Sequence, residues 1–408
     1  MPELDKRTYG IFSIPVIVGA LGYFVDIYDL LLFGIIRKQS LASLGLSESE
    51  VLTQGEFIIS VQMVGLMLGG ILWGVMGDKK GRLSVLFGSI LLYSLANIAN
   101  GMVQTVNQYA LLRFIAGVGL AGELGAGITL VSELLPKEKR GIGTSMVAGI
   151  GLTGAVVAYF ISKEFDWRIC YYIGGAMGIL LLILRIGVFE SGMFKEVKEM
   201  NVSRGNFFSF FTNKERFFKY LKCILIGLPT WFVIGVLVSF ADKFATEFGI
   251  TEPVSPGKAI MFAYVGISIG DILIGFVSQV LKSRKKALYI FYSLTMVFMT
   301  LFFMQKGGSS STMYLICAGL GFATGFWAIF VTIAAEQFGT NLRATAATTV
   351  PNMVRGALPL IIMLFKFLRE ATNYITGGVI TAILIMVITW IAAYFTKETF
   401  GKDLKYVE

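Results

Sequence analysis

The sequence predicts an all-α membrane protein whose twelve transmembrane helices form two parallel, pseudo-symmetric bundles of six. Three observations predict this fold class: a strongly apolar composition, apolar runs of membrane-spanning length, and an internal repeat. Of the 408 residues, 55% are hydrophobic and 15% are charged, and the mean hydropathy is +0.74. Soluble domains carry about 25% charged residues, so we expect lipid to surround most of this chain.

The predicted spans follow from the thickness of the bilayer. A hydrocarbon core of about 30 Å is crossed by roughly 20 apolar residues in a helix. Six runs of this kind give an N-terminal bundle over residues 1–189, six more give a C-terminal bundle over residues 219–408, and a basic linker over 190–218 joins the two. In chain order the spans are 11–36, 55–77, 84–104, 107–135, 142–163, 168–189, 219–241, 256–281, 287–305, 311–338, 344–368 and 373–396.

Basic residues between the spans indicate the orientation of the chain. They gather in alternate connections and in the linker, and cytoplasmic loops carry an excess of Lys and Arg. We therefore expect a multi-pass protein of a bacterial inner (plasma) membrane with both termini in the cytoplasm, although Arg37 and Lys38 would then lie outside. The basic residues on the cytoplasmic side are Lys79, Lys80, Arg82, Lys137, Lys139, Arg140, Lys195, Lys198, Arg204, Lys214, Arg216, Lys219, Lys282, Arg284, Lys285 and Lys286.

An internal repeat relates the two halves. Gly69–Gly74 aligns with Gly270–Gly275, and Ala116–Gly119 aligns with Ala318–Gly321. Parallel repeats of this kind are related by an axis along the membrane normal, and they place a solute site between the halves near the bilayer midplane.

The sequence lacks the residues that several function classes need. It has no histidine, and its cysteines (Cys170, Cys223 and Cys317) lie in separate apolar runs without metal-ligand spacing. It also has no glycine-rich nucleotide-binding loop between a strand and a helix. We therefore expect no enzyme, no cofactor and no metal, and any coupled proton must be carried by carboxylates. The net charge of +9 lies between the spans, which favours an orientation signal over a nucleic-acid partner.

The connection after the second span carries a recognisable motif. Gly74-Val-Met-Gly-Asp78-Lys-Lys-Gly-Arg82 resembles the signature loop of the major facilitator superfamily. Arg113–Gly119, the glycines from Gly149 to Gly154, and Asp166–Arg168 are similar to further motifs of that superfamily, so the resemblance covers the whole first half. It implies two bundles that rock around a central solute site.

Three shorter motifs resemble one branch of the superfamily, which contains metabolite:proton symporters and organic-ion transporters. They are Asp26–Asp29, Glu190–Phe194 and Glu336–Arg343. The second usually has Pro where this chain has Gly192, which argues against transferring a sugar-porter identity.

Four charged residues fall inside the first-half spans. At 1.5 Å per residue, Asp26 and Glu123 lie near the midplane, whereas Asp29 and Arg113 lie at similar depths further out. A charge inside the bilayer is expensive and normally faces a cavity or a partner. One hypothesis is that Asp26 or Glu123 carries the coupled proton and that Asp29 pairs with Arg113 in a way that changes with transport state. The alternative is that Asp29 and Arg113 only neutralise each other structurally.

The second half places Arg355 about 16 Å into its span, with Asn352 one turn away. A guanidinium suits a carboxylate or phosphate, so Arg355, Asn352 and Arg113 are candidate substrate-binding residues; the alternative for Arg355 is a salt bridge across the halves to Asp26 or Glu123. Organic-anion members of the resembled branch also favour a basic residue on this helix. The aromatic candidates for contact with the solute are Tyr28, Tyr159, Trp231 and Trp327.

Charged residues at repeat-equivalent cytoplasmic ends suit latches that break when the inner gate opens. The candidates are Asp78, Arg82, Glu133, Arg140, Glu336 and Arg343. Asp271, which replaces Gly70 in the repeat, is interpreted as a latch or a helix-end contact.

Together these features favour a monomeric secondary transporter that moves a small organic anion, such as a carboxylate metabolite, by proton-coupled symport. A proton-antiporting exporter of organic cations or drugs and a symporter of zwitterions, such as amino acids or betaine, stay open, as do sodium coupling and uniport. A membrane sensor is disfavoured because no soluble signalling domain is attached.

Overall fold

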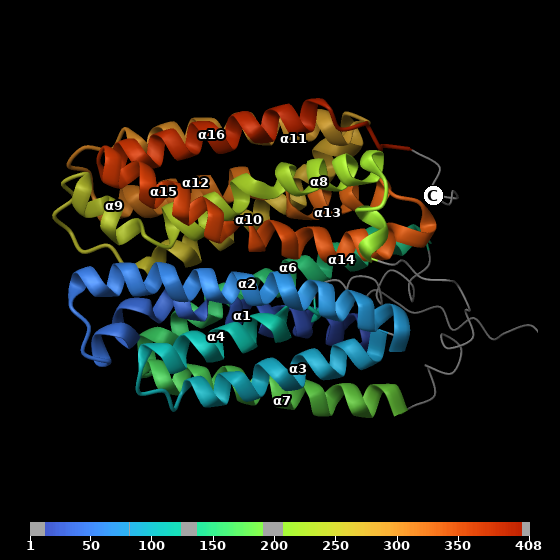
Figure 1. The fold of residues 1–408 in the computed structure, drawn as a ribbon, viewed down its shortest axis with the longest axis horizontal. Helices are drawn as coiled ribbons and strands as arrows, with labels where there is room; N and C mark the ends of the chain where they lie inside the picture. The colour runs from blue at the N-terminus through green and yellow to red at the C-terminus, as the bar shows by residue number, and fades with distance from the viewer. Residues whose placement is uncertain (1–12, 81, 124–136, 191–206, 402–408) are drawn as a thin grey trace, which may run out of the picture.

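The protein consists of two layers of roughly parallel and antiparallel helices that lie side by side along their length (Figure 1). The computed structural model describes residues 13–80, 82–123, 137–190 and 207–401. Helices α1 to α7 form one layer and helices α8 to α16 form the other. We call the end where α1 leads into α2 the α1–α2 end; it is the left end in Figure 1, opposite the C-terminus.

Within its described residues, the first layer contains six helices. Thr105 caps the start of α4 by accepting a hydrogen bond from the amide of Gln108, which satisfies one free N–H of the first turn. The helices are α1 (Ile14–Ser43), α2 (Glu48–Lys80), α3 (Arg82–Asn100), α4 (Val106–Leu120), α6 (Lys137–Glu164) and α7 (Trp167–Glu190).

The second layer has the same number of predicted spans but more interruptions. Its first helix begins inside the predicted linker, at Lys214, after a short 3-10 turn η2 (Phe207–Phe210). It then passes through a π-helical segment, η3 (Val233–Val238). The other helices are α8 (Lys214–Phe232), α9 (Ala241–Glu247), α10 (Pro256–Val280), α11 (Arg284–Phe303), α12 (Ser310–Thr324), α13 (Trp327–Glu336), α14 (Thr340–Gly356), α15 (Leu358–Ala371) and α16 (Tyr374–Tyr394).

Two spans that the sequence predicts as single helices are each split in two. The span predicted over 311–338 breaks at Gly325, where the chain passes so close to α10 that a Cβ would lie 2.7 Å from Cα of Gly270. The span predicted over 344–368 breaks after Gly356, because Pro359 has no amide N–H and its ring clashes with the carbonyl four residues back.

Close backbone packing confirms the internal repeat. A Cβ at Gly69 of α2 would lie 2.4 Å from the carbonyl oxygen of Val118, and one at Gly270 of α10 would lie 2.2 Å from that of Phe322. The same pairs of helices meet again where Gly117 and Gly321 face α2 and α10. By these contacts, Gly321 in the second half corresponds to Gly117 in the first half. The sequence alignment instead pairs Gly321 with Gly119.

The two layers meet along α2, which packs on α14 and α15, and along α6, which packs on α10. Near the middle of this interface the side-chain amide of Asn352 donates to the carbonyl oxygen of Ala121, 3.0 Å away. A Cβ at Gly70 would lie 2.7 Å from Cβ of Asn352, so glycine is needed for this approach.

The outer surface of the described helices is apolar. Ten of their spans are long and apolar enough to cross a membrane, and α3 carries a shorter apolar run over Val85–Asn100. Large aliphatic and aromatic side chains are exposed along this surface, which suits contact with lipid tails and not with water. Examples are Leu72, Phe160, Leu180, Phe276, Val280, Leu315, Leu360, Ile383, Ile391 and Tyr394.

Candidate functional site

Asp26 of α1 is a fully buried carboxylate whose two oxygens have no hydrogen-bond partner among the described residues. The charged groups that act on it electrostatically include Arg355 of the second half and Glu123, Asp29 and Arg185 of the first half. Asp26 is therefore influenced by charges on both sides of the interface. Because an unpaired charge inside the membrane is costly in free energy, a buried carboxylate without a partner is a candidate functional residue.

Asp29 lies one turn further along α1 and is ion-paired. Nη1 of Arg113 on α4 lies 3.0 Å from Oδ1 of Asp29, and both side chains are fully buried. The same guanidinium donates to Asn97 of α3 and lies over the ring of Tyr171. The structure therefore contains the ion pair that the sequence predicts, while its role in transport stays a prediction.

Glu123 is also paired, with a residue that the sequence analysis does not single out. Nη1 of Arg185 on α7 lies 3.1 Å from Oε2 of Glu123, and each side chain is 1% exposed. The pair lies against Gly22 of α1, where a Cβ would lie 2.2 Å from both side chains. Gly22 is one helical turn from Asp26, so the pair and Asp26 lie on the same face of α1. A basic residue inside the apolar span 168–189 is the signal that could have indicated Arg185.

Arg355 of α14 is 1% exposed and has no carboxylate within ion-pair distance among the described residues. Its Nη1 donates to Oδ1 of Asn352 at 3.2 Å, and its Nε lacks an acceptor. Its guanidinium carbon lies 5.7 Å from the ring centroids of both Trp231 and Trp327. The predicted substrate-binding residues Arg355, Asn352, Trp231 and Trp327 are thus brought together.

The broken helix places Trp327 in this cluster. Trp327 is the first residue of α13, and Oδ1 of Asp271 on α10 accepts a hydrogen bond from the backbone amide of the next residue, Ala328, at 3.0 Å. Asp271 therefore makes a helix-end contact, one of its two predicted roles, and holds the start of α13 by satisfying a free N–H group of its first turn.

The two tyrosine candidates lie apart from Arg355. The hydroxyl of Tyr28 donates to the carbonyl oxygen of Cys170 at 2.8 Å, so it ties α1 to α7. Tyr159 of α6 is half-buried, and it faces Gly257 of α10, where a Cβ would lie 3.3 Å from its ring.

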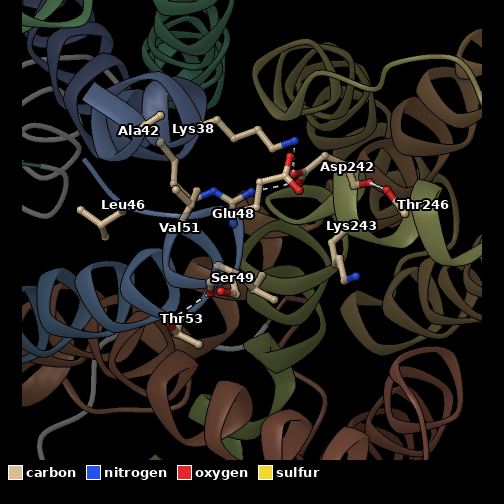
Figure 2. A pocket seen from close by; sticks show the side chains of 12 residues that line it. Lys38, Ala42, Leu46, Glu48, Ser49, Val51, Thr53, Asp242, Lys243 and Thr246 are labelled. Atoms are coloured by element: carbon tan, nitrogen blue, oxygen red, sulfur yellow. Dashed lines mark hydrogen bonds and ion pairs between the residues drawn. The ribbon is translucent and has the colours of Figure 1, made fainter. Parts of the chain in front are cut away.

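Two clusters of ion pairs join the halves at the α1–α2 end. Asp242 of α9 accepts from Nη2 of Arg37 at 3.0 Å and lies 2.9 Å from Nζ of Lys38, and Figure 2 shows the Lys38 ammonium directed at this carboxylate. Glu56 of α2 pairs with Arg369 of α15. We call these two contacts the outer latches; Arg37 and Lys38 are the basic residues that fitted the orientation rule poorly.

The predicted latches at the opposite end fall largely on undescribed parts of the chain. Glu133 lies outside the described residues, and so do the side chains of Asp78, Arg82, Arg140 and Arg343. Glu336 is described, and its Oε1 lies 3.5 Å from Nη2 of Arg284, within the second half.

Comparisons with known proteins agree with this fold. The model of the Major Facilitator Superfamily matches residues 19–363. The chain is 25% identical over 426 residues to the niacin transporter NiaP of Acinetobacter baylyi, covering 96% of this chain and 95% of that protein. It is 26% identical over 342 residues to the sialic acid transporter NanX of Escherichia coli, covering 82% and 81%.

A solved structure shows the same fold. The structure of a D-xylose-proton symporter superposes with a TM-score of 0.66 at 17% sequence identity, covering 95% of this chain and 99% of that one. At this identity the likeness concerns the fold alone, and it confirms the predicted fold class.

Proposed function

The chain belongs to the major facilitator superfamily and is a membrane transporter, not an enzyme, and from this premise we propose that it imports a small organic acid anion together with a proton. The relatives named for niacin and for sialic acid carry carboxylate-bearing solutes, which supports this substrate class. The two bodies that move are proposed to be residues 1–189 and 219–408, with 190–218 as the link between them.

One observation carries the proposal: one half holds a buried carboxylate without any partner among the described residues, and the other half holds a buried cation without a carboxylate partner among them. The carboxylate is Asp26 of α1, the cation is Arg355 of α14, and Arg355 is among the charges that act on Asp26. A solute carboxylate can neutralise Arg355, and a proton can neutralise Asp26. Both ligands then reduce the cost of buried charge, which links their binding.

Binding of the proton also favours binding of the anion, because Asp26 and the solute carboxylate compete for Arg355. A charged Asp26 attracts Arg355 and opposes the binding of a second carboxylate, whereas a protonated Asp26 leaves Arg355 free for the solute. Trp231 and Trp327 supply apolar walls, and the side chain of Asn352 orients the guanidinium. Asp29 and Glu123 are each neutralised by an arginine, so Asp26 is the strongest of the three proton-coupling candidates.

We propose that the gate at the α1–α2 end is closed. Two observations support this: the outer latches join the halves there, and the pocket between α1, α2 and η3 has a volume of only ≈ 20 Å³. We propose that this end faces the outside of the inner membrane and that the termini face the cytoplasm, following the distribution of Lys and Arg. Asp78, Arg82, Glu133, Arg140, Glu336 and Arg343 remain proposals for the inner gate.

An exporter of organic cations is the second candidate, and Arg355 argues against it. A cation held by Asp26 would lie beside an uncompensated guanidinium, and like charges repel strongly at low dielectric. A zwitterion would neutralise both Arg355 and Asp26. Unlike a simple acid, it requires Asp26 to stay charged while the zwitterion is bound.

The test is uptake by purified protein in liposomes. Radiolabelled nicotinate, benzoate, N-acetylneuraminate, an amino acid and an organic cation are each supplied with and without an inward proton gradient. Asp26→Asn and Arg355→Gln are compared with the wild type, and Lys163→Gln, which removes an exposed charge, is the control.

We expect gradient-driven accumulation of at least one acid by the wild type and by Lys163→Gln. Arg355→Gln loses uptake and binding. Asp26→Asn loses accumulation but retains exchange of internal for external solute, because exchange needs no net proton movement. The proposal would be overturned if only cations were taken up, or if acid uptake were unchanged by both Asp26→Asn and Arg355→Gln.

A further inference from the structure

A second pocket lies outside the central site, at the α1–α2 end. It has a volume of about 710 Å³ and lies between the connection from α1 to α2 and helix α9, at the mouth of the interface between the halves (Figure 2). The outer latch at Asp242 forms part of its wall.

Two cations of the pocket lining are the candidates for binding an anion. Arg37, Lys38 and Lys243 are cationic, and Asp242 and Glu48 are anionic. Lys243 pairs with Glu247, at 2.7 Å, so two cations and two anions remain. An anion would therefore bind Arg37 and Lys38 in place of Asp242.

Arg37 has unused capacity to donate hydrogen bonds. Its side chain is 1% exposed, and only Nη2 has an acceptor among the described residues, Oδ1 of Asp242. Nε and Nη1 are buried without an acceptor. Buried N–H groups of a cation are costly unless an acceptor is supplied. The Phe240 ring, 4.2 Å from the guanidinium carbon, covers one face and does not supply an acceptor.

The rest of the lining suits the body of a small organic acid. Ala42, Leu46, Val51 and Leu52 give the pocket an apolar side, and Thr53 and Thr246 add hydroxyl groups. Ligand sites typically combine an apolar lining with a few polar groups that fix orientation. This pocket has both.

We propose that this pocket is an entry site for the organic anion and that filling it weakens the outer latch. The inference rests on the proposed function, because it takes the solute to be a carboxylate arriving from this end. Within the described residues, Asp242 is ion-paired to α1 through Arg37 and Lys38, at 3.0 and 2.9 Å. A solute carboxylate competes with Asp242 for these same two cations, so loading the pocket releases the contact that closes the gate.

The test distinguishes binding in this pocket from binding at the central site. Binding of radiolabelled nicotinate and benzoate is measured by equilibrium dialysis on full-length protein carrying Arg355→Gln, which disables the central site. Asp242→Asn and Lys38→Gln are then added singly. Asp242→Asn removes the carboxylate that competes with the anion for both cations, whereas Lys38→Gln removes one cation that binds the anion and leaves the contact of Arg37 with Asp242 in place. Lys38 is 56% exposed, so its substitution leaves the packing intact.

We expect weak residual binding with Arg355→Gln, tightened by Asp242→Asn and weakened by Lys38→Gln, each by about threefold to fivefold as for an exposed ion pair. A second readout is the distance between spin labels at Met102→Cys and Lys306→Cys, which lie in connections of the two halves at this end; the native cysteines are buried. Nicotinate should lengthen this distance with Arg355→Gln and leave it unchanged when Lys38→Gln is added.

The outcomes also separate this inference from the proposed function. Absence of residual binding, or equal effects of Asp242→Asn and Lys38→Gln, overturns the entry site even if the wild type accumulates acids. Opposite effects of the two substitutions establish the entry site, even if the wild type shows no gradient-driven uptake and the proposed function fails.

Discussion

Arg369 of α15 and Glu56 of α2 form an ion pair that joins the two halves, with Nη2 of Arg369 3.0 Å from Oε2 of Glu56. The two side chains are 10% and 6% exposed, so the pair is largely shielded from water. Because it links α2 to α15 directly, its energy contributes to the closed state of the α1–α2 end and not to the stability of either bundle alone.

Replacing Glu56 by Gln should therefore shift the protein towards a state that is open at this end. Removing one partner leaves Arg369 without its charge partner, and a loss of about 1 kcal/mol already changes a population ratio about fivefold. Spin labels at Met102→Cys and Lys306→Cys should show a larger fraction of long distances. The swapped pair Glu56→Arg with Arg369→Glu should restore the short distance; an unchanged distance with Glu56→Gln would show that this contact does not hold the gate.

Gly22 should not tolerate a methyl group. A Cβ there would lie 2.2 Å from Nη2 of Arg185 and from Oε1 of Glu123, so a buried ion pair would have to move. Breaking buried pairs costs about 3–5 kcal/mol, and we expect Gly22→Ala to lower the melting temperature by several degrees and to impair uptake. Gly149→Ala on α6 is the matched control, since nothing lies within 4 Å of its Cβ and Ala favours helices. Equal melting temperatures for the two variants would contradict this account.

The sequence predicted features that depend on one helix at a time. The spans follow from apolar length, and the pairing of Asp29 with Arg113 follows from depth, because a rise of 1.5 Å per residue places both at the same level. The chain has 47 glycines and 8 prolines, small residues allow transmembrane helices to approach closely, and α2 approaches Val118 closely at Gly69.

Features that depend on how helices are rotated and which ones are neighbours could not be predicted in this way. Glu123 lies at a depth that suits several partners, and the packing of α7 against α1 is what brings Arg185 to it. The pairing of Asp242 with Arg37 likewise depends on α9 lying over the end of α1. The break at Gly325 depends on the closeness of α10, whereas Pro359 carried a local signal for the break before α15.

A double substitution should separate the two interpretations of the Asp29–Arg113 pair. Arg113→Gln alone leaves Asp29 buried without its cation, which should destabilise the protein by about 3–5 kcal/mol and lower its yield. Adding Asp29→Asn removes the orphaned charge and should restore the melting temperature close to that of the wild type.

Uptake by the restored double variant then gives the answer. If the pair only neutralises charge, gradient-driven accumulation returns together with stability. If the pair changes with transport state, as we predict, stability returns while accumulation stays low, and exchange at equal proton concentration is less affected. Full recovery of accumulation would contradict a role in coupling.

Asp271 should act on the substrate site through Trp327 without contacting the solute. Its carboxylate accepts from the amide of Ala328 at the start of α13, so Asp271→Ala removes the acceptor while Asp271→Asn keeps a carbonyl oxygen there. Loss of such a helix-end contact costs about 0.5–2 kcal/mol. If this loosens Trp327 over Arg355, the KM for uptake should rise about threefold to tenfold for Asp271→Ala, with little change in kcat. Asp271→Asn should stay near the wild type. Equal defects in both variants would show that the charge of Asp271, and not its position at the helix end, is what the site requires.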